Sequence, residues 1–246
     1  MITRKERERY DRQIRIDGLG IEGQEKLKQA RVLIAGVGGL GSPLAVYLAI
    51  AGVGNLRIVD NDEVSLSNLN RQPLYGAEDI GRKKTGTAEL RLQKLNPDIK
   101  VEAIFETITE ETVSRLVDGC DLILDAVDNF PARYVLNNAA IKMGVPFLYG
   151  GIYGLEGTMT TIIPRKTACL RCIFPDPPPS EIFPVLGSTA GTLGCLQAME
   201  AIKYIVGIGD MLTNRLLILD GFSMKFREVR FERDPQCPDC SPSAGS

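Results

Sequence analysis

The residues best placed to do chemistry form a glycine cluster between an apolar run and a helix-like segment: Gly36, Gly38, Gly39 and Gly41. Glycines let the backbone approach phosphate oxygens closely, and a helix start offers free N–H groups and the positive end of a dipole. A second apolar run ends in Asp60, nineteen residues after Gly41, where a carboxylate would accept hydrogen bonds from a ribose. The pattern predicts a nucleotide site, although it does not distinguish NAD from ATP, and a tight turn without a ligand is the alternative.

Charged and amide side chains gather after the predicted strands. They lie in the loop after Asp60, at the next helix start and after the fourth strand: Ser67, Asn68, Asn70, Arg71, Lys84, Asp128 and Asn129. A triphosphate reaction needs such a mixture, because cations neutralise phosphates and a carboxylate can hold Mg2+. A hydride-transfer enzyme commonly uses a histidine as acid or base, and the chain has none. Each group also has an ordinary structural explanation, such as a capped turn, a solvated helix face or a helix cap.

Two C-x-x-C pairs, Cys169/Cys172 and Cys237/Cys240, supply four thiolates in a chain without histidine. In a chain expected to be cytoplasmic, such pairs indicate a tetrahedral structural Zn2+ more than disulfides. The second pair begins 65 residues after the first one ends, so the metal would tie the C-terminal end back onto the domain. Reduced pairs or a redox pair are the alternative.

The chain alternates strand-like and helix-like segments, which indicates an α/β fold with a Rossmann-like, mostly parallel sheet and helices on both faces. The expected strands are 32–35, 55–60, 100–105, 121–125 and 146–150, and the expected helices are 40–51, 83–95, 110–116 and 131–143. Right-handed crossovers would bring the carboxyl ends of the strands to one edge, where ligands bind in such folds.

The C-terminal half is expected to extend this sheet with antiparallel strands. A strand over 154–164 is followed by a proline-rich irregular segment, a helix over 194–206 and strands over 215–219 and 225–232. We expect a single domain over 1–240, made of an N-terminal helical segment (1–30), a nucleotide-binding half (31–150) and an acceptor-binding and zinc half (151–240). The tail, 241–246, is expected to be disordered.

Composition excludes several classes of protein. The 246 residues are 44% hydrophobic, enough for a sizeable core, and the formal net charge of −2 argues against nucleic-acid binding driven by bulk charge. No apolar run approaches the ~18 residues that span a bilayer, and the charged N-terminus lacks the apolar core of a signal peptide. We therefore expect a cytoplasmic protein that has no membrane partner.

Seven motifs follow one another along the chain: RYDRQIRI, GVGGLGSP, VDNDEVSLSNLNRQ, DAVDN, CLRCIFP, LGCLQAMEAIK and CPDC. From about Glu8 to Cys240 the chain resembles the MoeB/ThiF adenylyltransferases, relatives of the ubiquitin-activating enzymes. The resemblance implies that it uses MgATP to activate the C-terminal Gly-Gly carboxylate of a ubiquitin-like sulfur-carrier protein, giving an acyl adenylate and pyrophosphate.

The resemblance also implies roles for individual residues. Asp60 would take the ribose, and Asp128 would hold Mg2+. Lys84 would neutralise the transferring centre, with Lys83 as a close competitor. The phosphates would meet the glycine cluster and two side chains of the following loop, Asn68 and Arg71.

Arg12 resembles the arginine that reaches into the neighbouring subunit's site in this family, which implies a homodimer. A carboxylate nucleophile is already ionised at pH 7, so this chemistry needs no general base. Positioning and charge neutralisation would therefore be the main catalytic tools.

Many members of the family carry a further cysteine after the first zinc pair, which forms a thioester or a sulfur-transfer link. The corresponding segment here, PPPSEIFPVLGSTAG, has none, and Ser180 is the nearest polar candidate. Cys195, expected to begin a helix, and Cys120, before a buried strand, are explained as small buried residues. We therefore expect adenylation without a covalent cysteine step, and a separate donor protein or free sulfide as the source of any sulfur.

Two other functions stay open on the sequence alone. The same scaffold could adenylate a small molecule, a peptide or a tRNA base. The chain could also be a catalytically silent partner that binds a ubiquitin-like protein. Molybdopterin, thiamine or thiolated-tRNA synthesis and protein modification are all compatible pathways.

Overall fold

The computed structural model of the chain describes residues 1–177 and 183–241. Within these residues, eight strands form one sheet in the order β3-β2-β1-β4-β5-β6-β7-β8, so both halves of the chain contribute to it. The first five strands are parallel, and the last three add antiparallel pairs. The expected Rossmann-like α/β fold is confirmed. Ser180 and residues 242–246 of the expected tail lie outside the described residues.

The parallel strands are β1 (Arg31–Ala35), β2 (Asn55–Asp60), β3 (Lys100–Phe105), β4 (Leu122–Asp125) and β5 (Phe147–Tyr153). The connecting helices are α4 (Gly41–Ala51), α5 (Lys84–Leu95), α6 (Glu110–Val117) and α7 (Phe130–Met143), with short turns η1 (Leu66–Asn68) and η2 (Ala77–Asp79) before α5. These strands and helices agree with the expected ranges to within three residues. The register sets Ala35 between Val59 and Asp125, so the carboxyl ends of three strands meet at one edge.

The C-terminal half supplies β6 (Glu156–Ile162), α8 (Leu170–Ile173), α9 (Gly187–Val206), β7 (Arg215–Asp220) and β8 (Lys225–Arg230). Two expectations were wrong here. The proline-rich segment begins with the short helix α8 rather than with irregular chain, and α9 begins at Gly187, seven residues before the expected start.

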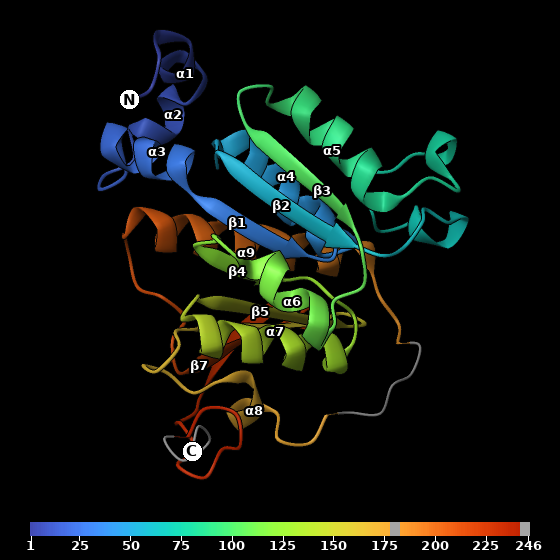
Figure 1. The fold of residues 1–246 in the computed structure, drawn as a ribbon, viewed down its shortest axis with the longest axis vertical. Coiled ribbons are helices and arrows are strands. Elements are labelled where there is room, and N and C mark those ends of the chain that lie inside the picture. Colours follow the sequence, from blue (N-terminus) through green and yellow to red (C-terminus); the bar gives the residue numbers. More distant parts are fainter. Residues whose placement is uncertain (178–182, 242–246) are drawn as a thin grey trace.

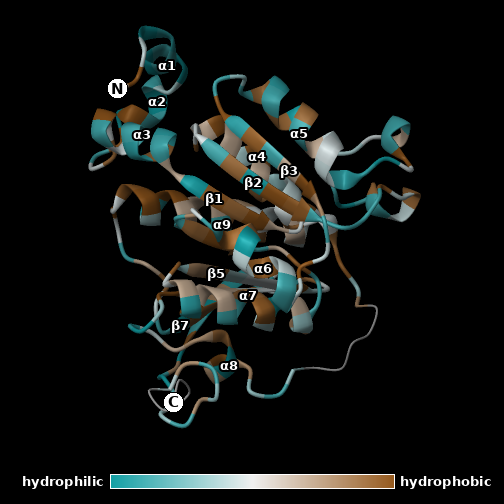
Figure 2. Cartoon of the chain, viewed as in Figure 1, coloured by the Kyte–Doolittle hydropathy of each residue, from teal (hydrophilic) through white to brown (hydrophobic). Residues whose placement is uncertain are grey.

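The sheet carries a hydrophobic core on each face. One core packs α4, α5 and α9 against the sheet, and the other packs α6, α7 and the cysteine region against the opposite face. Figure 2 shows the apolar colour concentrated on the central strands and on α4 and α9, whereas α1 and α2 are largely hydrophilic. No helix in the described part of the chain is long and apolar enough to cross a membrane.

Three helices precede the sheet: α1 (Arg4–Arg9), α2 (Asp11–Ile14) and α3 (Gly20–Gln29). We call α1 and α2 the arm. Figure 1 shows the arm beside the starting end of β1, away from the end at which the strand arrow points. A capping box between Thr3 and Glu6 starts α1, which matches the polar sequence of this segment.

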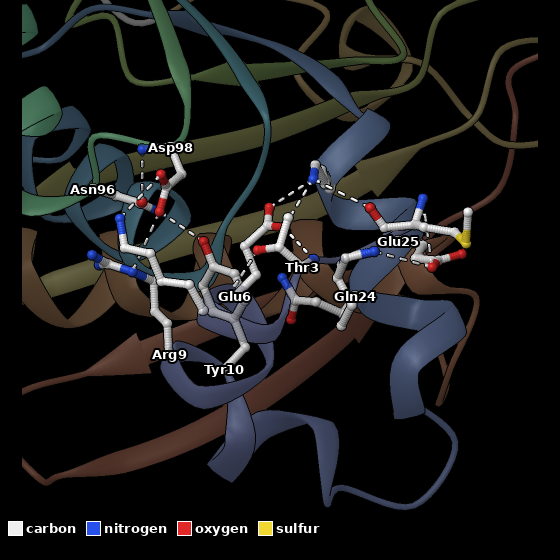
Figure 3. Close-up of polar contacts among 12 residues, drawn as sticks. Thr3, Glu6, Arg9, Tyr10, Gln24, Glu25, Asn96 and Asp98 are labelled. Atoms are coloured by element: carbon white, nitrogen blue, oxygen red, sulfur yellow. Dashed lines mark hydrogen bonds and ion pairs between the residues drawn. The ribbon is translucent and has the colours of Figure 1, made fainter.

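Glu6 anchors the arm to α3, and its ion pair makes stability depend on pH. Lys28 Nζ lies 2.8 Å from Glu6 Oε1, and the Thr3 backbone N–H donates to Oε2 at 2.7 Å (Figure 3). Burial alone would raise the pKa of Glu6, but hydrogen bonds from Lys28 and Thr3 outweigh it and lower the pKa to about 2. A lowered carboxylate pKa stabilises the fold above the unfolded-state value, and this contribution is lost as pH falls.

Glu6→Gln is therefore expected to lower the free energy of unfolding by about 2 kcal/mol at pH 7. The difference from wild type should shrink below pH 4.5 and vanish near pH 2, as measured by denaturant titration at several pH values. Glu8→Gln, on an exposed position of the same helix, is the matched control. A pH-independent deficit in Glu6→Gln would contradict the ion-pair explanation.

Candidate nucleotide-binding edge and cysteine cluster

The glycine cluster forms the turn between β1 and α4, and two of its members are fixed by close backbone packing. A Cβ on Gly36, whose φ is +91°, would lie 2.5 Å from the carbonyl oxygen of Ala126. A Cβ on Gly41 would lie 2.0 Å from the carbonyl oxygen of Gly36. A larger residue would force this turn and the loop after β4 apart. The absence of side chains at these positions therefore lets the ends of β1 and β4 pack closely.

Asp60 ends β2 beside this turn and braces it. Its Oδ2 accepts the Val37 backbone N–H at 2.9 Å, and its Oδ1 accepts the Asp62 N–H at 2.9 Å. Burial raises the pKa of Asp60, while the nearby charge of Lys84 opposes that rise. Each carboxylate oxygen keeps a second lone pair, so the side chain can still accept a hydrogen bond from a ligand hydroxyl.

The two neighbouring lysines have different surroundings. The Lys84 side chain is buried, and its Nζ donates to Asp62 Oδ2 at 2.7 Å. Lys83 is exposed, with its Nζ 4.4 Å from the centre of the Phe105 ring. The structure thus brings Lys84, rather than Lys83, into the group of charges around Asp60. Sequence reasoning missed Asp62 as the partner that holds this lysine.

The loop after β2 brings Arg71 against the glycine turn. Its Nη1 donates to the Ser67 carbonyl at 2.8 Å and to Asn70 Oδ1 at 3.1 Å. A Cβ on Gly39 would lie 3.3 Å from Arg71 Cγ. Asn68 is buried and accepts the Ser65 backbone N–H through Oδ1 at 3.1 Å, so this part of the loop is a capped turn. That capping leaves the Arg71 guanidinium in a fixed place beside the turn.

Asp128 and Asn129 follow β4 and have separate roles. Asn129, not Asp128, is the N-cap of α7, because its Oδ1 accepts the Ala132 N–H at 2.9 Å. Asp128 is exposed, and its Oδ1 accepts the Asn129 side-chain amide at 3.3 Å. Helix capping therefore does not occupy the Asp128 carboxylate.

A buried ion pair supports this loop, which the sequence did not reveal. Asp125 Oδ2 lies 3.1 Å from Arg133 Nε, and Arg133 Nη2 also donates to the carbonyls of Val127 at 2.8 Å and Gly150 at 3.2 Å. Burial raises the pKa of Asp125 to about 6, against the opposing charge of Arg133. Arg133 thus joins the loop after β4 to β5, and nothing in the sequence indicated that Asp125 and Arg133, eight residues apart, would form a buried pair.

Arg12 is the one predicted catalytic residue that the structure sets apart from this edge. It lies on α2, and the neighbouring Gln13 side chain donates to the carbonyl oxygen of Ala51, the last residue of α4, at 2.8 Å. The glycine turn is at the other end of this helix of 11 residues, which is about 16 Å long at 1.5 Å per residue. Arg12 is exposed and stays far from the nucleotide edge of its own chain.

The four cysteines of the two C-x-x-C pairs converge. Their sulfur atoms all lie within 4.8 Å of one another, with separations of 3.9 Å for Cys169–Cys172, 3.6 Å for Cys169–Cys237 and 3.5 Å for Cys172–Cys240. Tetrahedral Zn–S bonds of about 2.3 Å would set sulfurs roughly 3.8 Å apart, whereas a disulfide needs about 2.05 Å. The donor set therefore fits a structural Zn2+.

The cysteine cluster is tied to α7 by polar contacts around it. Asn137 Oδ1 accepts the Leu170 N–H at 2.9 Å, and its amide donates to Asp239 Oδ2 at 3.2 Å. Arg171 Nε lies 3.4 Å from the same Asp239 oxygen. These contacts join α8 and the C-terminal pair to α7, and Figure 1 shows α8 beside the last described residues of the chain.

The remaining two cysteines lie apart from this cluster. Cys120 is buried against Arg57 and the Leu116 carbonyl, as expected for a small core residue. Cys195 lies within α9 rather than at its start, since the helix begins at Gly187. Burial raises the pKa of both thiols, which lowers the thiolate fraction available for nucleophilic attack.

Cys195→Ala is expected to retain at least half of the wild-type adenylation rate and all of the bound zinc. The side chain is half-buried in α9 and contributes no ligand to the cysteine cluster. Pyrophosphate exchange and metal analysis would check this. A thioester trapped on Cys195 would overturn it.

Known proteins share both the sequence and the fold. A model of the ThiF family matches residues 10–239. The sulfur carrier protein adenylyltransferase of Thermus thermophilus is 42% identical over 249 residues, which cover 97% of this chain and 92% of that protein. The SAMP-activating enzyme E1 of Haloferax volcanii is 42% identical over 239 residues, covering 95% of this chain and 88% of that protein.

A solved structure agrees with these relatives. The crystal structure of E. coli MccB with ATP has a TM-score of 0.82 and 26% identity, covering 89% of this chain and 69% of that chain. The fold, the order of the motifs and the extent of the match together show that the chain belongs to the ThiF family.

Proposed function

We propose that this protein adenylates the C-terminal Gly-Gly carboxylate of a ubiquitin-like sulfur-carrier protein with MgATP and releases pyrophosphate. The observation that carries the proposal is the surroundings of the glycine turn: Asp60 and Arg71 contact it, Lys84 lies near Asp60, and the loop that leads to Asp128 packs on Gly36. The two relatives named for sulfur-carrier and SAMP activation support the choice of acceptor.

The residues of the edge fit each part of the nucleotide. Asp60 would accept the ribose hydroxyls, and the free N–H groups of the turn would meet the phosphates at the start of α4. Arg71 and Lys84 would neutralise charge on the phosphates, with Ser67, Asn68, Asn70 and Asn129 completing the polar lining. Asp128 would hold Mg2+, whose positive charge would reduce the repulsion between the phosphates and the incoming carboxylate.

The reaction needs no proton transfer. An oxygen of the acceptor carboxylate attacks the α-phosphorus, the bond from that phosphorus to the bridging oxygen breaks, and pyrophosphate leaves with the electron pair. The barrier lies in bringing an anion to a polyanion, so Lys84 and Arg71 act by position and charge. The burial of Lys84 strengthens its field, because water screens it less.

Two further parts of the proposal concern assembly and location. Exposed apolar side chains lie just after the arm and on the helices α4 and α9: Ile16, Tyr47, Ile50 and Met199. They favour a homodimer in which Arg12 reaches the partner's nucleotide edge.

Four clustered thiols that hold Zn2+ suit a reducing compartment, so we place the protein in the cytoplasm. A separate donor would supply sulfur after adenylation, for a sulfur-containing cofactor, thiolated tRNA or protein modification.

The deciding experiment offers the protein ATP with each Gly-Gly-ending small protein of its own organism. Pyrophosphate exchange that depends on one such protein, and that stops when its final glycine is deleted, is the expected result. Small molecules, peptides and tRNA serve as competing acceptors in parallel reactions. Exchange with one of these instead would replace the proposed acceptor, and ATP binding without any exchange would point to a silent binding partner.

A further inference from the structure

The arm is held to the body of the protein by four buried or half-buried polar side chains, which we call the clamp: Tyr10, Gln13, Gln24 and Asn96. They come from three places, because Tyr10 and Gln13 belong to the arm, Gln24 to α3 and Asn96 to the end of α5. Figure 3 shows Tyr10, Gln24 and Asn96 among the polar contacts of this region.

The clamp grips the carboxyl end of α4, where helix carbonyls have no partner within the helix. The Ala51 carbonyl accepts Nε2 of Gln13 at 2.8 Å and Nε2 of Gln24 at 3.0 Å. Asn96 Nδ2 donates to the Ala49 carbonyl at 2.7 Å and to the Tyr10 hydroxyl at 2.8 Å. Gln13 also donates to Gln24 Oε1, so the four side chains form two bonded pairs on neighbouring carbonyls of α4, Gln13 with Gln24 and Tyr10 with Asn96.

The hydrogen bonds of the clamp fix the arm in one orientation on the body of the protein. Gln24 and Asn96 are 0% exposed and Tyr10 is 4% exposed. Burial of such groups is costly unless each is hydrogen-bonded, so only the paired arrangement is stable. The Tyr10 ring also rests on Gly52, where a Cβ would come within 2.5 Å of the ring. A purely apolar contact would let the arm slide over α4, whereas these directional hydrogen bonds do not.

Arg12 is the residue that this orientation directs. It directly precedes Gln13 on α2, and neighbouring helix positions point about 100° apart. With Gln13 held against α4, Arg12 is left exposed and directed away from that contact. Its own nucleotide edge lies at the far end of α4, so a second copy of the chain is the partner whose edge it can serve.

We propose that the clamp is a positioning device that holds Arg12 for the nucleotide edge of a partner subunit. The inference rests on the proposed function, in which Arg12 acts across a homodimer. Tyr10, Gln13, Gln24 and Asn96 touch no substrate and act through Arg12. Loosening the clamp in one subunit then impairs the site of the other subunit and not its own.

Mixed dimers distinguish damage to the partner's site from damage to the mutated subunit's own site. One subunit carries Asp128→Ala, which disables its own edge but still supplies Arg12, and the other carries Arg12→Ala, which keeps a complete edge but supplies no arginine. Distinct affinity tags on the two subunits isolate the mixed species. Gln13→Ala is then placed in either subunit, and Gln29→Ala, on an exposed position of α3, is the matched control.

Gln13→Ala is expected to weaken ATP affinity and lower exchange by about tenfold when it is in the subunit that supplies Arg12, because small misplacements of a charged group are costly. In the other subunit, the change should stay within twofold, and Gln29→Ala should do little in either place. Tyr10→Phe, which removes one hydroxyl, should repeat the asymmetry. Melting temperature should fall equally in both arrangements, so stability alone cannot produce the asymmetry.

Equal losses in the two arrangements would overturn the inference, as would failure of the Arg12→Ala and Asp128→Ala subunits to restore each other's ATP affinity. The readout by ATP affinity needs no acceptor. An incorrect carrier protein would therefore show in the wild-type exchange reaction and leave the test of the clamp intact.

Discussion

Replacing Asp128 by alanine is expected to lower pyrophosphate exchange by about 10³-fold, equivalent to roughly 4 kcal/mol of transition-state stabilisation. The Asp128 carboxylate is exposed and does not cap α7, because Asn129 performs the capping. Without this carboxylate, Lys84 and Arg71 would neutralise the phosphates without the added positive charge of Mg2+. The effect should appear in the affinity for MgATP as well as in the catalytic rate.

The fold should survive this change. Asp128 is exposed, and its carboxylate accepts a long hydrogen bond of 3.3 Å from the Asn129 side chain, so alanine removes little stability. Asp118→Ala, an exposed aspartate at the other end of β4, is the matched control and should keep wild-type exchange. Raising Mg2+ should recover part of the Asp128→Ala rate if the lost interaction is with the metal. Wild-type exchange in Asp128→Ala would remove the proposed magnesium role.

The central part of this structure could be predicted from sequence because its signals are local. Each parallel strand is a short apolar run, each break carries glycine or capping residues, and a right-handed crossover leaves only one edge for the carboxyl ends. Gly36 and Gly41 could be chosen because glycine lets the backbone approach a phosphate closely, and the structure shows that both also pass a neighbouring backbone at close range. The strength of these local signals explains why the expected bounds of these strands and helices agree with the structure to within three residues.

The start of α9 was missed for a physical reason. Its first turns, GSTAG, read as a loop, because small and polar residues are poor evidence for a helix. Small residues are needed there, since a Cβ on Gly187 would lie 2.6 Å from the Asn70 carbonyl. Farther along, a Cβ on Gly194 would lie 2.6 Å from the Leu40 carbonyl. The helix passes directly over the glycine turn and the loop of Arg71, and this tertiary demand overrides helix propensity.

Pairing between buried polar side chains of different elements could not be predicted either. Asp125 and Arg133 form a buried pair, and the clamp joins residues of the arm to the end of α5. Neither leaves a periodic pattern, because a single polar residue in an otherwise ordinary helix looks like a solvated position. Only burial distinguishes the two cases, and burial depends on the packing of the whole chain. Sequence therefore located the residues that would touch the nucleotide better than those that hold them in place.

Cys172→Ser is expected to abolish stoichiometric zinc binding and to lower the melting temperature by about 10–20 °C. Wild-type protein should contain about one zinc ion per chain. Loss of one thiolate from a four-sulfur site removes much of its metal affinity, and a structural metal contributes directly to folding. A loss of ~5 kcal/mol corresponds to that temperature change at 2–4 °C per kcal/mol for a chain of this size.

Loss of zinc should also destabilise elements outside the cysteine cluster. Zinc would join α8 to the C-terminal pair, and the surrounding contacts of Asn137 and Arg171 with Asp239 carry that connection to α7. Hydrogen exchange should therefore rise in α7 and in the C-terminal pair, and much less in β1 and α4. Burial raises the pKa of Cys169, so in the absence of metal this thiol stays protonated.

Cys195→Ala serves as the control, because its sulfur lies outside the cluster and its zinc content should match wild type. Metal analysis, thermal melts and hydrogen exchange on the two variants side by side make the comparison. A Cys172→Ser protein with full zinc content, or a metal-free wild type of undiminished stability, would show that the four sulfurs lie together without serving as a metal site.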